Sequence, residues 1–183
     1  MFEFSDDKDW VTPHQDNWRR LLGHLVDRPV SMLEIGAYEG RSSLWWIQNI
    51  LTHSKSILHI VEPRVRPLLV TNLSRLPPGT QWHLHKEHSI DALAFFIVNR
   101  VLFDIVYVDG SHEGIDCLTD LLLAERMMAV GGIMIIDDYL WGNPQGTRHH
   151  PPKPAVDAFI ELNAHRMQVI HKKYQVAIRK TAH

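Results

Sequence analysis

The 183-residue sequence has one cysteine, no long apolar run and no marked excess of charge of one sign. The single cysteine, Cys117, excludes an intrachain disulfide and is typical of a reducing compartment. No stretch approaches the roughly 20 apolar residues that a membrane-spanning helix needs. The net charge of −2 provides no positive field that would attract nucleic acid or an anionic membrane surface.

The first residues (MFEFSDDKD) are acidic and lack the apolar core of a secretory signal. We therefore expect a cytoplasmic protein with neither a nucleic-acid nor a membrane partner. Apolar residues make up 45% of the chain and charged residues 22%, which is ordinary for a globular protein. The length suits one domain over residues 1–183, which includes an N-terminal helix region at residues 1–29.

The stretch from residue 30 to residue 43 organises the prediction of the fold. The apolar run Val30 to Ile35 has the length of a buried strand. Gly36 and Gly40 follow, and an apolar helical pattern begins just after them. A strand, a glycine-rich turn and a helix start are the mononucleotide-binding half of a doubly wound sheet, in which the glycines let a ligand approach the backbone.

Glu34 interrupts the apolar run near its end. Ionised groups are rare in a strand core unless they have a partner, and a cationic amine on a ligand is one such partner. The alternative is a structural turn with a solvated carboxylate.

The rest of the chain alternates strand and helix patterns, which predicts a parallel sheet with right-handed crossovers and helices on both faces. Helices are expected near residues 13–27, 41–51, 65–75, 89–100, 113–129 and 155–164. Strands are expected at residues 30–35, 56–62, 80–85, 101–109 and 133–136, followed by a hairpin of residues 167–171 and 175–179. The irregular segment 141–154 is interpreted as an active-site loop, with a passive loop as the alternative.

Acidic side chains stand at the predicted carboxyl ends of several strands, where an open parallel sheet binds its ligands. Glu62 occupies the position at which a carboxylate accepts hydrogen bonds from ribose hydroxyls, although an exposed strand-end glutamate would look the same. Asp109, Asp137 and Asp138 could hold Mg²⁺ or another hard cation through oxygen ligands. Equally, Asp137 and Asp138 could cap a turn while Asp109 accepts backbone N–H groups.

His83, His85 and His88 lie close together in the sequence. No carboxylate or cysteine completes a metal-ligand set beside them, so we do not expect a metal site there.

Three segments carry a resemblance to a known family. Residues 33–42 (LEIGAYEGRS) resemble the first motif of class I S-adenosylmethionine (SAM) methyltransferases, with a form similar to that of catechol O-methyltransferases. Residues 103–112 (FDIVYVDGSH) and 131–139 (GGIMIIDDY) resemble the small metal-dependent O-methyltransferases, which include macrolide-sugar enzymes. The resemblance implies a Rossmann-like α/β fold with a seven-stranded, mostly parallel sheet and an antiparallel C-terminal strand.

The resemblance also implies roles for individual residues. Asp109, Asp137 and Asp138 correspond to the acids that bind Mg²⁺, and His112 takes the place of the catalytic base. A histidine at a helix start that only touches the ligand is the alternative for His112. SAM contacts are expected from residues at the strand ends and turns, namely Glu34, Gly36, Tyr38, Gly40, Ser42, Glu62, Ser89 and Asp109; Ser89 could also simply cap its helix.

The predicted function is SAM-dependent methyl transfer to a hydroxyl group of a small molecule, assisted by a divalent metal. The alternative is a SAM-binding domain of the same fold without methyl transfer. A nicotinamide reductase is disfavoured because the spacing Gly36-x-x-x-Gly40 differs from Gly-x-Gly-x-x-Gly. A homo-oligomer is left open.

Overall fold

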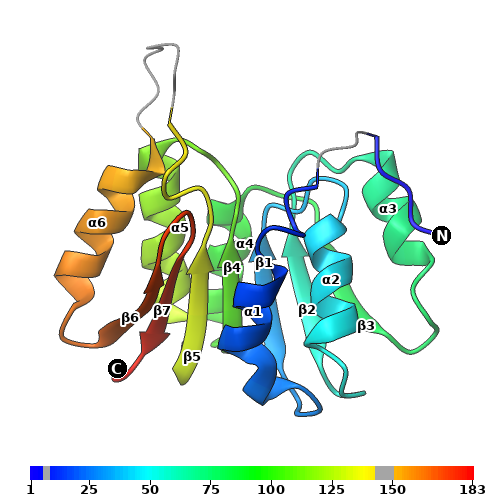
Figure 1. Cartoon of the computed structure of the whole chain (residues 1–183), viewed down its shortest axis with the longest axis horizontal. Coiled ribbons are helices and arrows are strands. Elements are labelled where there is room, and N and C mark those ends of the chain that lie inside the picture. Colours follow the sequence, from blue (N-terminus) through cyan, green and yellow to red (C-terminus); the bar gives the residue numbers. More distant parts are fainter. Residues whose placement is uncertain (6–8, 143–150) are drawn as a thin grey trace.

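A computed structural model of the chain describes residues 1–5, 9–142 and 151–183. Its centre is a seven-stranded sheet in the order β3-β2-β1-β4-β5-β7-β6 (Figure 1). The strands are β1 (Ser31–Ile35), β2 (Ile57–Val61), β3 (Gln81–His85), β4 (Phe103–Val108), β5 (Met128–Ile136), β6 (Met167–Lys172) and β7 (Val176–Lys180).

The strand pairing confirms the predicted fold class. β1 is parallel to β2 and to β4, β2 is parallel to β3, and β4 is parallel to β5. β7 runs opposite to the other six strands, because it pairs antiparallel with both β5 and β6. The sheet is therefore mostly parallel, with an antiparallel strand at the C-terminal end of the chain.

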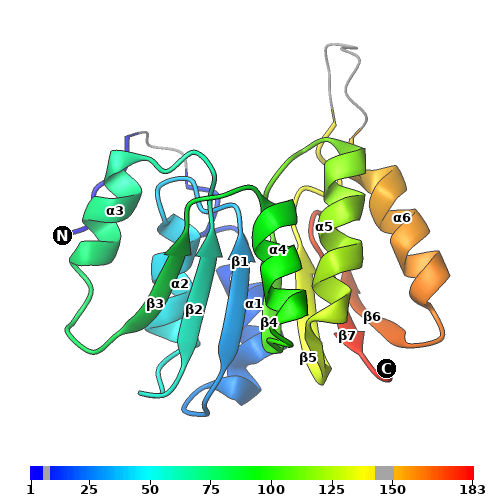
Figure 2. The same ribbon diagram turned by 180° about the vertical axis from the view of Figure 1, so that it is seen from behind.

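Helices cover both faces of the sheet, as Figures 1 and 2 show from opposite sides. The helices are α1 (Gln15–Leu22), the 3₁₀ helix η1 (Gly23–Leu25), α2 (Arg41–Asn49), α3 (Pro67–Ser74), α4 (Ser89–Val98), α5 (Gly114–Arg126) and α6 (Pro152–Asn163). In β1, Met32 packs into the core beneath α1, α2 and α3, while Leu33 packs into the core beneath α4, α5 and α6. This alternation explains why the strand is apolar on both faces.

β5 begins earlier than the sequence pattern indicated. The predicted helix ran to Ala129, but α5 ends at Arg126 and Met128 already pairs with Phe103. Gly131 has a φ of +90°, and a Cβ on Gly132 would lie 2.9 Å from the carbonyl oxygen of Ala129. The two glycines thus permit an irregular stretch inside the strand instead of ending the helix.

Two other boundaries differ. The helix predicted over residues 13–27 is shorter, and η1 follows it directly. α6 begins at Pro152, inside the segment interpreted as a loop, because a proline at the first helical position needs no hydrogen bond for its nitrogen. Residues 143–150 of the predicted active-site loop lie outside the described residues. Among the described helices, none has the length and apolar character required to cross a membrane.

Candidate functional site

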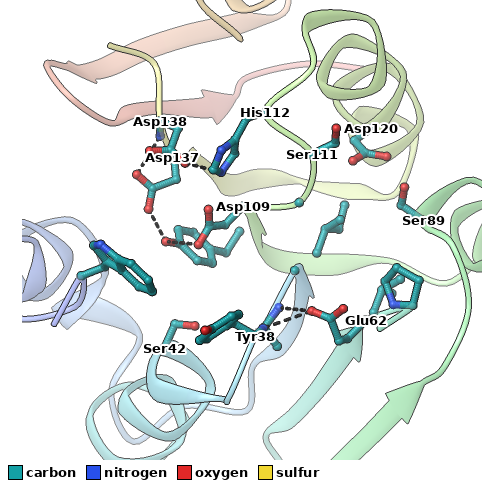
Figure 3. Close-up of a pocket in the computed structure, with 18 of the residues that line it drawn as sticks. Tyr38, Ser42, Glu62, Ser89, Asp109, Ser111, His112, Asp120, Asp137 and Asp138 are labelled. Carbon is teal, nitrogen blue, oxygen red and sulfur yellow. Dashed lines mark hydrogen bonds and ion pairs between the residues drawn. The ribbon is translucent and has the colours of Figure 1, made fainter. Parts of the chain in front are cut away.

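A cavity of about 890 Å³ lies beyond the carboxyl ends of β1, β2, β4 and β5 (Figure 3). This is the edge at which an open parallel sheet is expected to bind ligands. Residues from widely separated parts of the chain line it, from Phe4 near the N-terminus to Tyr174 just before β7. All the predicted SAM-binding residues line this cavity except Glu34 and Gly40.

The glycine turn after β1 has the backbone conformation that makes glycine necessary. Gly36 has a φ of +84°, and a Cβ there would lie 2.0 Å from the carbonyl oxygen of Asp109. Gly40, which precedes α2, has a φ of +83°, and a Cβ there would lie 2.8 Å from a methyl carbon of Leu69. Gly36 therefore lets the β1 turn rest against the end of β4, and Gly40 lets α2 begin close to α3.

Glu62 lies at the end of β2 on the cavity wall and holds this turn. Its Oε2 accepts hydrogen bonds from the backbone N–H groups of Ala37 and Tyr38, both at 3.1 Å. Its Oε1 accepts a third from Arg64 N–H at 2.9 Å. The carboxylate is thus fixed at the position that the sequence predicted for a ribose contact, and that contact stays a prediction.

Glu34 is fully buried and does not line the cavity. Its carboxylate accepts hydrogen bonds from the hydroxyl groups of Ser42, at 2.6 Å, and Ser43. Burial raises the pKa of Glu34 to about 7, while the two hydroxyl groups act in the opposite direction. A ligand amine was predicted near Glu34 because a buried carboxylate needs a hydrogen-bond partner. In this structure, two serines of α2 are such partners.

Asp109, His112 and Asp138 converge on one side of the cavity (Figure 3). One potential ligand atom of each residue lies within 4.8 Å of those of the other two. In the part of the chain that the structure describes, this is the single group of three or more potential metal ligands. His112 Nε2 lies 2.7 Å from Asp138 Oδ2, and the Tyr174 hydroxyl donates to Asp138 Oδ1 at 2.7 Å. Asp138 has a φ of +55°, a strained conformation of the kind that gathers at functional sites.

The charged groups of this cluster shift one another's pKa values. Burial, together with the nearby carboxylates of Asp137 and Asp138, raises the pKa of Asp109 well above its usual value. Burial would also raise the pKa of Asp138, but hydrogen bonds from His112 and Tyr174 outweigh it and lower that pKa. The bond to Asp138 raises the pKa of His112. A cation among these groups would relieve their repulsion.

Asp137, the third predicted metal ligand, is outside this group of three. Its carboxylate accepts hydrogen bonds from the Tyr107 hydroxyl and from Gln175 Nε2, the latter at 2.8 Å, and it also bonds the backbone N–H of Asp138 at 2.7 Å. Gln175 in turn accepts a hydrogen bond from the indole N–H of Trp18 at 2.8 Å. A network from α1 to the end of β5 thus orients Asp137.

Sequence reasoning missed one wall of the cavity. For the first residues the sequence indicated only an acidic character and the lack of a signal core, yet Trp10 and Val11 line the site, and so does His14 just before α1. The His14 ring stacks on Tyr174 with centroids 5.7 Å apart. The two aromatic residues in the first four and the tryptophan at position 10 were the available signal that this segment packs against the domain.

Three histidines on β2 and β3, namely His59, His83 and His85, form a separate group. Nδ1 of His59 on β2 lies 3.1 Å from Nε2 of His85 on β3, and the rings of His59 and His83 are 5.3 Å apart. At 3.1 Å, the imidazoles of His59 and His85 form a hydrogen bond. Within the described residues, the one group of three potential metal ligands does not include these side chains.

A Rossmann-like sheet ending in an antiparallel strand, with a glycine turn and acids at the strand ends, defines the class I methyltransferase fold. The family model described as a methyltransferase domain matches residues 33–139. The chain therefore belongs to this methyltransferase domain family.

Solved structures with this fold share little sequence with the chain. A protein from Clostridium thermocellum described as an rRNA methylase has 12% identity and a TM-score of 0.75, with 92% of this chain and 96% of that chain covered. An O-methyltransferase from Bacillus cereus in complex with SAH has 16% identity and a TM-score of 0.71, with 97% and 84% covered.

The methyltransferase MycE of the mycinamycin biosynthetic pathway, in complex with Mg, SAH and mycinamycin VI, has 16% identity and a TM-score of 0.69. The match covers 96% of this chain but only 50% of MycE, so the chain spans about half the length of that enzyme. At such identities the likeness concerns the fold. No curated protein matches the chain.

Proposed function

We propose that this protein transfers the methyl group of SAM to a hydroxyl group of a small molecule with the help of a divalent cation such as Mg²⁺. The observation that carries the proposal is the convergence of Asp109, His112 and Asp138 on one side of a cavity whose opposite side holds Glu62 and Ser89 (Figure 3). Complexes of structural neighbours with SAH, and of MycE with Mg, support the choice of cofactor and metal.

The donor set fits a hard cation. Asp109 and Asp138 offer carboxylate oxygens at the cavity, and the imidazole of His112 lies beside them. Carboxylate oxygens are preferred ligands of Mg²⁺ and Mn²⁺, and water or substrate can complete the coordination. When bound, the cation would lower the pKa of the acceptor hydroxyl. Asp137, oriented by Tyr107 and Gln175, would be the third ligand, as the sequence predicted.

His112 is the proposed base. Its imidazole lies on the cavity wall, and Asp138 at 2.7 Å orients it. A neutral imidazole can remove the hydroxyl proton, after which the acceptor oxygen attacks the sulfonium methyl group. The Asp138 carboxylate would then stabilise the imidazolium that forms. Glu62 and the Gly36 turn would hold the nucleoside part of SAM, as the sequence predicted.

A nucleic-acid acceptor is the second candidate, since one neighbour is described as an rRNA methylase. The net charge of −2 and the acids at the cavity disfavour a polyanionic substrate. Incubation with methyl-labelled SAM should therefore label hydroxylated small molecules, such as sugars and catechols, and leave ribosomal RNA unlabelled. Labelled RNA with no labelled small molecule would contradict the proposal.

The metal requirement has its own test. Asp138→Ala should abolish turnover while the protein stays folded, and EDTA should inhibit the wild type until Mg²⁺ or Mn²⁺ is restored. Asp91→Ala is a matched control, because Asp91 is exposed on α4 and does not line the cavity. Full turnover in excess EDTA would reject the role of the cation.

A further inference from the structure

The first five residues of the chain lie beside α3, as Figures 1 and 2 show from opposite sides, and Phe4 among them lines the cavity. This segment has no part in the chemistry proposed above. Two buried polar residues anchor it, namely Asn72 on α3 and Glu39 in the turn between β1 and α2.

Asn72 pairs with the backbone of the segment. Its Oδ1 accepts a hydrogen bond from the backbone N–H of Glu3 at 2.9 Å, and its Nδ2 donates to the carbonyl oxygen of Glu3 at 2.8 Å. The same Nδ2 donates to the backbone carbonyl oxygen of Glu39 at 3.0 Å. Asn72 is fully buried, so these bonds are shielded from competing water. One side chain thus connects the segment to the turn that precedes α2.

Glu39 holds the segment through its carboxylate. Its Oε2 accepts a hydrogen bond from the backbone N–H of Ser5 at 2.8 Å, and its Oε1 accepts one from the Ser5 hydroxyl at 2.6 Å. Burial acts to raise the pKa of Glu39, but the bonds from Ser5 outweigh burial and lower that pKa. An ionised carboxylate accepts with both oxygens, and hydrogen bonds to a charged acceptor are stronger than those between neutral groups.

Phe4 lies between these two anchored residues, Glu3 and Ser5, so its ring has little freedom to leave the cavity wall. The guanidinium carbon of Arg41, the first residue of α2, lies 4.0 Å from the centre of the ring. A cation at this distance is attracted to the face of an aromatic ring. A ligand in the cavity that contacts Phe4 would bury apolar surface of the ring.

We propose that Glu39 is a positioning residue for the cofactor: by holding Ser5, it keeps Phe4 against bound SAM and slows the release of SAM. This inference rests on the proposed binding of SAM and extends it to the N-terminal segment. The contact with Phe4 has to be broken as the ligand leaves, so the effect falls mainly on the dissociation rate.

Surface plasmon resonance with SAH, on protein immobilised through its C-terminus, measures both rates. Phe4→Ala should release SAH about tenfold faster, the scale of the apolar contact that part of an aromatic side chain makes. Glu39→Gln should release SAH faster by a similar factor, because an amide cannot accept both bonds from Ser5. The association rate should be nearly unchanged in both variants.

A double variant separates positioning from a purely structural role. If Glu39 acts through Phe4, the protein with both Phe4→Ala and Glu39→Gln should release SAH no faster than Phe4→Ala alone. Ser5→Ala should also release SAH faster than the wild type, whereas Ser5→Thr, which keeps the hydroxyl, should retain the wild-type rate.

Phe95→Ala on α4 and Glu161→Gln on α6 are exposed changes away from the cavity lining and should keep the wild-type rate. Thermal unfolding without ligand reports the folding of each variant. Wild-type protein that does not bind SAH would overturn the proposed function along with the inference. A wild-type dissociation rate in Phe4→Ala, or effects that multiply in the double variant, would overturn the inference alone. If Glu39→Gln does not fold, the result for Ser5→Ala decides.

Discussion

Among the histidines that the structure describes, His112 is set apart by its contact with a cavity carboxylate, Asp138. If it is the base, His112→Ala should lower kcat by about 10²- to 10⁴-fold, the usual share of general base catalysis. The affinity for SAH should change little, because the imidazole is needed for proton removal. kcat/KM of the wild type should rise with pH as the imidazole becomes neutral.

Steady-state kinetics with a hydroxylated acceptor and calorimetry with SAH measure these effects. His165→Ala is the matched control, since His165 follows the end of α6, is exposed and does not line the cavity. A His112→Ala protein with wild-type kcat would remove the base role and leave His112 as a residue that positions Asp138.

The buried carboxyl group of Glu34 leads to a prediction about how the unfolding free energy depends on pH. Its pKa is raised from 4.5 to about 7 by burial, so the folded protein disfavours the ionised form. As the pH rises, Glu34 therefore loses its proton at a lower pH in the unfolded chain than in the folded protein. The contribution of Glu34 to stability is therefore largest below pH 4.5 and declines as the pH rises to 7, by about 3 kcal/mol over that interval.

Glu34→Gln removes this titration. The difference in unfolding free energy between wild type and variant should shift in favour of the variant as the pH is raised from 4.5 to 7. Denaturant titrations at several pH values measure it, with the exposed Glu161→Gln on α6 as a control that should show no such trend. A constant difference across this range would show that Glu34 ionises normally in the folded protein.

The network between α1 and β7 shows how whole elements position the acid cluster. Trp18 on α1 donates to Gln175, Gln175 donates to Asp137, and the ring of Trp18 packs against Tyr107 with centroids 5.6 Å apart. Burial raises the pKa of Tyr107 well above its usual value, so its hydroxyl remains a donor to Asp137. The N-terminal helix is thus connected to the chemistry at the sheet edge.

Gln175→Ala should weaken this connection. Partners that orient metal ligands typically contribute 10- to 100-fold to metal affinity, so Mn²⁺ binding should weaken by about that factor. SAH affinity measured without metal should be nearly unchanged. Gln168→Ala on β6 is the control, because Gln168 is exposed. Equal Mn²⁺ affinities in the two variants would show that Asp137 needs no such support.

The elements that could be predicted are those whose sequence pattern is local. The strand at residues 31–35, its glycine turn and the acids after β4 and β5 follow from apolar runs bounded by glycine and carboxylates. The start of β5 could not be predicted, because it depends on the pairing of Met128 with Phe103 of β4, and two glycines at 131 and 132 interrupt the local pattern. The network that orients Asp137 could not be predicted either, since it includes a hydrogen bond between Trp18 and Gln175, which are 157 residues apart.

At the scale of the whole molecule, the cavity joins segments from both ends of the chain. Phe4, His14 and Tyr174 line it together with the loops of the sheet. A ligand bound there should therefore stabilise the entire domain against unfolding. The alternation of strands and helices predicted the sheet and the edge at which it binds ligands. The aromatic residues of the N-terminal segment signal that it packs against the domain, but they do not specify that it packs at the site.

Because a ligand in the cavity should stabilise the whole domain, it should raise the temperature of thermal unfolding. SAH at about 100 times its dissociation constant should add about 2.7 kcal/mol to the unfolding free energy. For a chain of this size that corresponds to a rise of about 5–10 °C in Tm. NAD at the same concentration should leave Tm nearly unchanged, because the turn from Gly36 to Gly40 lacks the dinucleotide spacing. A shift with NAD equal to that with SAH would mean that the cavity recognises a nucleoside without selecting the sulfonium cofactor.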